Sequence, residues 1–264
     1  MIKENKDFFL YVLGIIGLFI LTLLLLDFLS PGTISNEACG LLNFKCWFKS
    51  DSEKIKTYNS SPQMVIDTNK EYKAVIKTSL GDFEVNLFKE NAEKTVNNFV
   101  FLVNENYYDG VKFHRIVKGF IIQTGDRNTL DSISDNDGQG GPGYTFEDEI
   151  NWESLDLSNA KKQQLENLGY LSDAGIISKH LVQWSIAMAN SGPDTNGSQF
   201  FVVTGSSNDQ IVKGLEGRHT VFGEVSAGFD VVKVINNVQV DNPNSDSPKP
   251  TEDIVINDIE IQEK

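Results

Sequence analysis

The stretch FHRIVKGFIIQTGD, residues 113–126, joins two short apolar runs that are typical of β-strands. These runs are VKFHRIV (111–117) and FIIQTGD (120–126). Similar runs follow downstream: SIAMAN (185–190), SQFFVVTG (198–205), TVFGEV (220–225) and DIVINDIEI (253–261). Many short strands with few helices favour a closed antiparallel barrel over a parallel sheet. The sequence therefore predicts a mainly β protein.

Upstream of this stretch, YKAVIKTSLGDFEVNLF (72–88) alternates apolar and polar residues on both sides of Leu80-Gly81 and predicts a β-hairpin. Two segments show helical spacing instead. Their apolar positions are Val96, Phe99, Val100 and Val103 in the first, and Phe229, Val232 and Ile235 in the second. We expect both helices to pack on the core, with Asn91 as a candidate cap of the first.

The pattern changes between residues 150 and 180, which we interpret as a helical insertion on the barrel. Ser158 has the side chain of a helix N-cap, AKKQQLENL follows it, and Gly169 is suited to end the helix.

The N-terminal region has the composition of a membrane anchor. Residues 8–29, FFLYVLGIIGLFILTLLLLDFL, reach the roughly 20 apolar residues needed to cross a bilayer, and no signal-peptide cleavage site follows. Lys3 and Lys6 precede the span, whereas the first cation after it is Lys45. We therefore expect a cytoplasmic N-terminus (1–7), a single-pass anchor in the cell membrane (8–29), a linker (30–63) and an extracytoplasmic domain (64–264).

Composition argues against several other functions. A formal net charge of -14 would repel a nucleic-acid backbone, and we find no basic patch to offset it. The two cysteines, Cys39 and Cys46, lack the paired spacing of a metal site. A small disulfide and two free thiols both remain open for them.

Other enzyme motifs are absent or poorly placed. GQGGPG (138–143) has GxGxxG spacing, but no strand precedes it and Pro142 stands where a helix would begin, so we interpret it as a flexible loop. With three histidines in the chain, a metal centre would have few nitrogen ligands. The chain lacks a GxSxG elbow, and a hydrolase that uses one histidine and a serine remains a minor alternative.

Three segments in order carry a more specific signal: FHRIVKGFIIQTGD (113–126), ANSGPDTNGSQFFV (189–202) and LEGRHTVFG (215–223). Together they resemble the signature of the cyclophilins, over residues 72–261. The resemblance implies a closed eight-stranded antiparallel barrel capped by two helices, here in a membrane-anchored bacterial form. It also implies peptidyl-prolyl cis-trans isomerase activity on proline-containing polypeptides, with neither cofactor nor metal.

Carried over position by position, the resemblance implies a shallow groove for an Xaa-Pro peptide. The residues with catalytic roles would be Arg115, Gln123 and His219, and those that bind substrate would be Phe120, Ile121, Ala189, Asn190, Gln199, Phe201 and Leu215. Without the family pattern, the apolar members of this set would be assigned to the barrel core.

The residue types suit this reaction, which rotates a peptide bond and breaks none. Phe120, Ile121, Phe201 and Leu215 offer apolar surface for a pyrrolidine ring. The Arg115 guanidinium stays charged and can donate to the prolyl nitrogen without transferring a proton. Gln123 would orient Arg115, and His219 would border the pocket rather than act as a base.

Two features depart from the family pattern. Gly214 stands before Leu215, where drug-sensitive cyclophilins have a Trp, and the loop at 205–214 looks lengthened, so we expect weak inhibition by cyclosporin. The second departure is the insertion. A binding module of the same fold that does not accelerate isomerisation is the main alternative, although such a module would not need Arg115.

Overall fold

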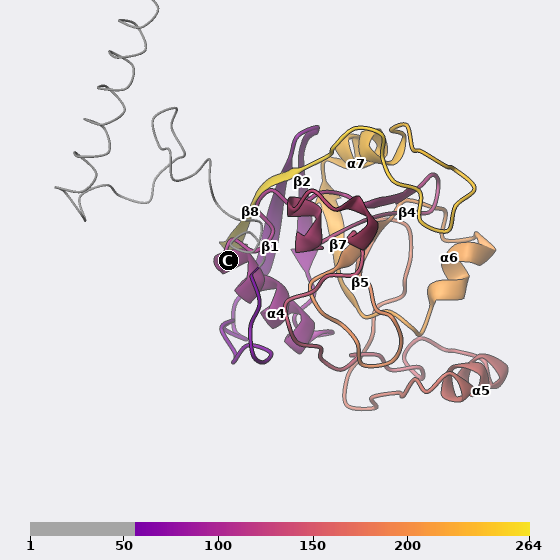
Figure 1. The fold of residues 1–264 in the computed structure, drawn as a ribbon. Coiled ribbons are helices and arrows are strands. Elements are labelled where there is room, and N and C mark those ends of the chain that lie inside the picture. The colour runs from indigo at the N-terminus through magenta and orange to yellow at the C-terminus, as the bar shows by residue number, and fades with distance from the viewer. Residues whose placement is uncertain (1–55) are drawn as a thin grey trace, which may run out of the picture. The chain divides into compact units, whose positions relative to one another are not determined.

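The computed structural model describes residues 56–264, in which one antiparallel sheet has the strand order β3-β4-β6-β5-β7-β2-β1-β8 (Figure 1). The strands are β1 (Tyr72–Thr78), β2 (Gly81–Leu87), β3 (Arg115–Val117), β4 (Ile121–Thr124), β5 (Ser185–Met188), β6 (Phe200–Val203), β7 (Val221–Ala227) and β8 (Ile256–Glu263). The helices are α4 (Glu93–Asn104), α5 (Asn159–Asn167), α6 (Gln210–Leu215) and α7 (Phe229–Asn236), with short 3₁₀ turns η1 (Arg127–Leu130) and η2 (Ser134–Asn136).

The predicted hairpin is confirmed. β1 and β2 pair in register from Tyr72 with Leu87 to Thr78 with Gly81. Buried residues alternate with partly exposed ones along β1, so the side chains at every second position enter the core.

The sheet separates two apolar layers. Along β4 and β6, alternate residues face the main core, among them Ile122, Phe200 and Val202. Their neighbours on the opposite face belong to a second cluster, which contains Ile121, Phe201 and Val203. This second layer, outside the half-barrel, is the floor of the groove described below.

The prediction of a closed barrel is wrong for the residues that the structure describes. The sheet is a curled half-barrel with β3 and β8 at its ends, and no ladder joins these two strands. The neighbour of β3 is instead an irregular segment, where the Ile116 N–H donates to the Pro248 carbonyl (2.9 Å). Because Pro248 has no N–H to donate in return, a regular ladder cannot continue there, and an isolated bridge between Lys112 and Val255 replaces it.

Both predicted core helices are present, as α4 and α7. Asn91 does not cap α4, whose N-cap is Ala92. The free N–H groups of the first turn are satisfied by a distant side chain: the Glu149 carboxylate accepts from the N–H of Lys94 (2.9 Å) and from that of Thr95 (2.8 Å).

The insertion at 150–180 forms its own small core. Ser158 caps α5 by accepting from the Lys161 N–H (3.3 Å), and Gly169 follows the helix with a φ of 88°, as predicted for both residues. The buried apolar residues of the insertion's core are Ile150, Trp152, Leu155, Leu165 and Tyr170.

The N-terminal predictions concern residues that are mostly not described. The anchor at 8–29 and both cysteines lie outside residues 56–264, and so does most of the linker. Within the described residues, no helix combines the length and the apolar character needed to cross a bilayer. The last residues of the predicted linker contact the domain, since the Tyr58 N–H donates to the Pro142 carbonyl (2.7 Å) and Asn97 donates to the Gln63 carbonyl (3.1 Å).

Candidate active site

Strand register brings the central site residues together. Arg115 on β3 pairs with Gln123 on β4, and Gln123 in turn pairs with Phe201 on β6. Because directly paired residues project on the same face of a sheet, these three side chains form a row across three strands on the outer face.

Two fixed acceptors hold the Arg115 guanidinium. Its Nη1 donates to the Gln123 Oε1 (3.0 Å), and its Nε donates to the backbone carbonyl of Asp246 (2.9 Å). Burial lowers the pKa of Arg115 from its ordinary value, but an arginine of this kind stays protonated at neutral pH. Arg115 therefore has a set orientation and still has N–H groups to offer a substrate.

A relay of side-chain amides continues from Arg115. Gln123 Nε2 donates to Gln199 Oε1 (3.0 Å), and Gln199 Nε2 donates to the carbonyls of Gly138 (3.0 Å) and Gly140 (2.8 Å). The orientation of Arg115 is thus coupled to the glycine-rich loop at 138–143.

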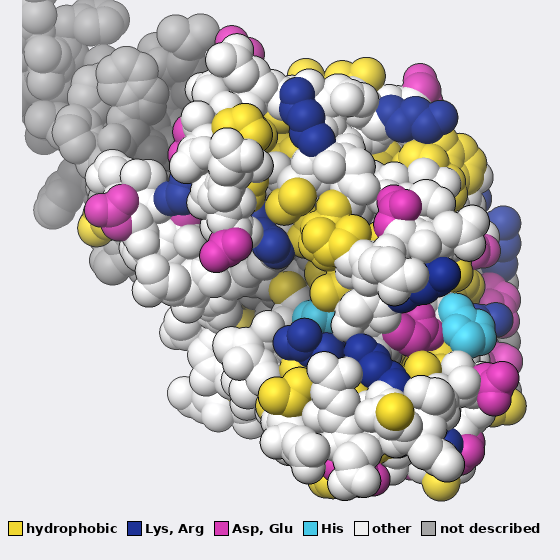
Figure 2. Space-filling model, turned by 90° about the vertical axis from the view of Figure 1, so that its right-hand side faces the viewer, with side chains coloured by type: hydrophobic (Ala, Val, Ile, Leu, Met, Phe, Trp, Pro, Cys, Tyr) yellow, Lys and Arg dark blue, Asp and Glu magenta, His cyan; other side chains and the backbone are white. Residues whose placement is uncertain are grey.

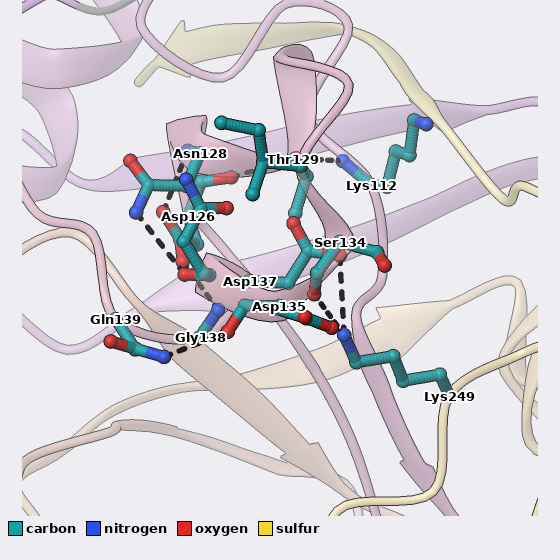
Figure 3. Close-up of polar contacts among 12 residues, drawn as sticks. Lys112, Asp126, Asn128, Thr129, Ser134, Asp135, Asp137, Gly138, Gln139 and Lys249 are labelled. Atoms are coloured by element: carbon teal, nitrogen blue, oxygen red, sulfur yellow. Dashed lines mark hydrogen bonds and ion pairs between the residues drawn. The ribbon is translucent and has the colours of Figure 1, made fainter.

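The carboxylate of Asp126 anchors that glycine-rich loop just after β4. It accepts from the N–H groups of Asn128 (2.8 Å), Gly138 (2.5 Å) and Gly140 (3.0 Å), as Figure 3 shows for Gly138. A Cβ at Gly140 would lie 2.1 Å from the Asp126 Oδ1, so only glycine fits there. Beside it, Lys249 forms an ion pair with Asp137 (3.7 Å; Figure 3).

The groove itself has a cavity of about 400 Å³. Figure 2 shows the side of the molecule on which α5 and α6 lie, where basic, histidine and hydrophobic side chains surround a hollow. Nine of the ten predicted site residues line the cavity: Arg115, Phe120, Ile121, Gln123, Ala189, Asn190, Phe201, Leu215 and His219. The tenth, Gln199, lines an adjoining cavity that shares Gln123 with it.

His219 is fixed at the edge of the apolar floor. Its ring packs edge-on against Phe201, with 5.3 Å between ring centroids, and its Nδ1 lies 3.0 Å from the Met188 carbonyl. Because a carbonyl oxygen only accepts, Nδ1 carries the proton. Burial lowers the pKa of His219 to about 4, so the ring is neutral at physiological pH.

Further residues that the sequence did not indicate also line the cavity. Gly138 and Gln139 line the cavity from the glycine-rich loop, and Asp246 and Ser247 line it from the segment before β8. The prediction that GQGGPG forms a loop is confirmed, but its sequence does not indicate a contact with Gln199. Asp246 acts through its backbone carbonyl, which no side-chain pattern reveals.

Comparison with known proteins identifies this arrangement. Residues 73–261 match the family described as cyclophilin type peptidyl-prolyl cis-trans isomerase/CLD. This chain belongs to the cyclophilin family. Two curated relatives are peptidyl-prolyl cis-trans isomerase CYP18-2 of Arabidopsis thaliana and peptidyl-prolyl cis-trans isomerase B of Streptomyces anulatus. The first is 39% identical, covering 63% of this chain and 82% of the relative, and the second is 36% identical, covering 72% and 95%.

A solved cyclophilin-type isomerase of Cryptosporidium parvum, determined in the presence of the dipeptide Ala-Pro, has a TM-score of 0.53 and 31% sequence identity. The match covers 72% of this chain and 98% of that one. Several other curated relatives are much longer, and this cyclophilin spans only about a quarter of their length.

The position of Gly214 allows the expected drug insensitivity of this cyclophilin to be tested by gain of function. Gly214 is exposed in α6, and a Cβ added there would meet no atom within 4 Å. We expect weak cyclosporin inhibition of the native protein. Gly214→Trp should strengthen it about tenfold, since an indole adds apolar surface and an N–H donor.

Inhibition constants for native protein, Gly214→Trp and Gly214→Leu would check this, because leucine adds surface without the donor. Tight inhibition of the native protein, or no gain with tryptophan, would contradict the assignment of Gly214 to the drug-contact position.

Proposed function

We propose that this chain is an active peptidyl-prolyl isomerase that speeds the folding of exported or surface proteins with slow Xaa-Pro bonds. The observation that carries the proposal is a charged Arg115, held by two hydrogen bonds, beside an apolar floor. A module that only bound proline would not need such a donor.

Rotation about a prolyl bond is slow because resonance stiffens the amide, with a barrier of about 20 kcal/mol and uncatalysed times of roughly 10 to 100 s. In the twisted state the resonance is lost, and the prolyl nitrogen becomes pyramidal and accepts a hydrogen bond. Arg115 donates to that nitrogen or to the adjacent carbonyl. Because this interaction forms chiefly in the twisted state, it lowers the barrier more than it strengthens binding.

The other site residues hold the peptide during rotation. Phe120, Ile121, Phe201 and Leu215 grip the proline ring, and the Asn190 backbone with Gln199 holds the chain around it. Gln123 keeps Arg115 in place. His219 completes the ring pocket, and it abstracts no proton because the reaction moves none.

The neutral state of the groove histidine predicts a flat pH profile. Burial lowers the pKa of both His219 and His114 to about 4, so neither titrates between pH 8 and 5.5. The isomerisation rate should change less than about twofold over this range, whereas a histidine base with an ordinary pKa would lose roughly tenfold.

Stability should behave differently, since the unfolded histidines take up protons below about pH 6.5 and the folded ones do not. The contribution of these two histidines to the free energy of unfolding should therefore be complete above about pH 6.5 and be lost as the pH falls toward 4. Rates and urea unfolding at the same pH values check both parts, and a tenfold loss of rate by pH 5.5 would show that a titrating base takes part.

We further propose that the domain is held outside the cytoplasm by the anchor at 8–29. The length of that apolar run, the lysines before it and the absence of a cleavage site support this orientation. Protease added to cells or spheroplasts that make the full-length chain should then remove the domain. Protection until the membrane is lysed would refute the orientation but not the enzyme activity.

Refolding of a protein limited by an Xaa-Pro bond tests the proposed role in folding. Catalytic amounts of the full-length chain should accelerate the slow refolding phase and leave the fast phases unchanged. An unchanged slow phase would count against a role in folding.

A further inference from the structure

We propose that the insertion at 150–180 is a clamp that positions the groove loop, residues 214–219, with Trp152 and Tyr170 as its two positioning residues. The groove loop supplies Leu215 and His219 to the proline pocket. The inference rests on the proposed isomerase function, because the position of these two residues matters only if the groove binds a prolyl peptide.

The first arm of the clamp holds the groove-loop backbone. The buried indole of Trp152 donates from Nε1 to the Gly217 carbonyl (3.1 Å), and Lys161 on α5 donates from Nζ to the Gly214 carbonyl (3.2 Å). The loop is therefore fixed at two carbonyls by side chains of the insertion.

Packing around Gly217 makes this arm tight. Gly217 has a φ of 81°, and a Cβ added there would lie 2.7 Å from Leu157 Cδ1 and 2.8 Å from Leu165 Cδ1. The small core of the insertion thus packs directly on the backbone between Leu215 and His219. Glycine is required at 217 both for its conformation and for this approach.

The second arm links the groove loop to the segment that follows β5 and lines the same cavity. Tyr170 Oη donates to Asn190 Oδ1 (3.3 Å), and Asn190 Nδ2 donates to the Arg218 carbonyl (2.9 Å). The Arg218 guanidinium lies 5.8 Å from the centre of the Tyr170 ring. Tyr170 therefore fixes a residue next to Ala189 and one next to His219 at the same time.

A third contact fixes the middle of the groove loop. Glu216 accepts from the Leu181 N–H (3.1 Å), and its other oxygen lies 2.9 Å from the His180 Nδ1, at the end of the insertion. Contacts from residues 150–181 thus reach the loop at Gly214, Glu216, Gly217 and Arg218. In Figure 1, α5 of the insertion lies on the same side of the sheet as α6, whose last two residues are the first two of the groove loop.

Such a clamp affects binding more than the chemical step. A loop ordered before the substrate arrives does not have to lose its freedom on binding, so the peptide binds more tightly. Leu215 contacts the proline ring in the ground and twisted states alike. Loosening it should therefore raise KM and leave kcat nearly unchanged.

The test uses substitutions in the full-length protein that remove one donor and keep an aromatic ring at the position. Trp152→Phe removes the N–H to Gly217, and Tyr170→Phe removes the hydroxyl to Asn190. Each should raise KM for an Ala-Pro peptide about fivefold, as expected for the loss of one hydrogen bond, with kcat within about twofold. Amide hydrogen exchange at residues 215–219 should also become faster.

Matched controls separate positioning from general stability. Tyr72→Phe removes a hydroxyl that accepts from the Asp67 N–H (2.7 Å) far from the groove, and Trp184→Phe changes a ring that packs on Phe229 (5.3 Å between centroids). Both controls can lower the melting temperature, but they should leave KM and loop exchange at the native values.

The outcomes distinguish the clamp from the enzyme function. Peptide dissociation constants are measured in parallel, so the clamp can be tested even if the native protein binds peptide without turnover. Binding without turnover would reject the isomerase function and leave the clamp open to this test. If Trp152→Phe and Tyr170→Phe both bind peptide as the native protein does, or if the controls raise KM equally, the insertion does not position the loop.

Discussion

Replacing Arg115 with Ala is expected to lower kcat for Xaa-Pro isomerisation by about 10² to 10³, or roughly 3 to 4 kcal/mol of transition-state stabilisation, as for the loss of one preorganised donor. Peptide affinity should change little, because the guanidinium acts chiefly on the twisted amide. The fold should persist, since Arg115 lies on β3, an end strand of the sheet, and outside the main core.

Two further variants make the Arg115 experiment specific. Arg115→Lys should not restore the rate fully, because an ammonium lacks the planar fork that reaches Gln123, the Asp246 carbonyl and the substrate together. Lys213→Ala removes an equal charge from the exposed part of α6 and should leave kcat unchanged. Near-normal turnover by a folded Arg115→Ala variant would contradict the mechanism even in a genuine cyclophilin.

Phe201→Ala should lower the peptide affinity and kcat/KM together. Phe201 is only 3% exposed and belongs to the apolar floor, which we propose holds the proline ring in the ground state and in the twisted state alike. Loss of a buried phenyl group corresponds to roughly 2 to 3 kcal/mol, and kcat/KM should fall about 30- to 150-fold, mainly through KM.

The neighbouring residue offers the control. Phe200 lies on the opposite face of β6 and packs in the main core, with its ring 5.6 Å from that of Phe99. Phe200→Leu should therefore lower the free energy of unfolding and leave the KM of the folded protein unchanged. A Phe201→Ala variant with native KM would show that the proline ring binds elsewhere.

Local sequence patterns predicted those elements whose stability is local. The alternation in residues 72–88 was sufficient for the β1-β2 hairpin, and Ser158 with Gly169 marked both ends of α5, because caps and turns depend on residues next to one another. The resemblance, rather than periodicity, predicted that Phe201 and Ile121 face the groove. Periodicity shows that two faces differ, but it does not distinguish a core from a binding floor.

What the patterns missed depends on contacts between distant segments. Glu149 caps α4 in place of Asn91, and Asp246 holds Arg115 through a backbone carbonyl. The interruption between β3 and β8 arises because Pro248 lies opposite Ile116, a pairing that the sequence does not reveal. The contact of Trp152 with Gly217 joins the insertion to the groove in the same way.

Exchange NMR on an Ala-Pro peptide with a catalytic amount of the full-length protein would show whether the groove and Arg115 accelerate rotation of the prolyl bond. Without enzyme the cis and trans forms interconvert in roughly 10 to 100 s, too slowly for exchange cross-peaks. We expect cross-peaks within a second for the native protein, and we expect Arg115→Ala to abolish them although the peptide still binds. Peptide binding by the native protein without any cross-peak would show that it is a proline-binding module and not an isomerase.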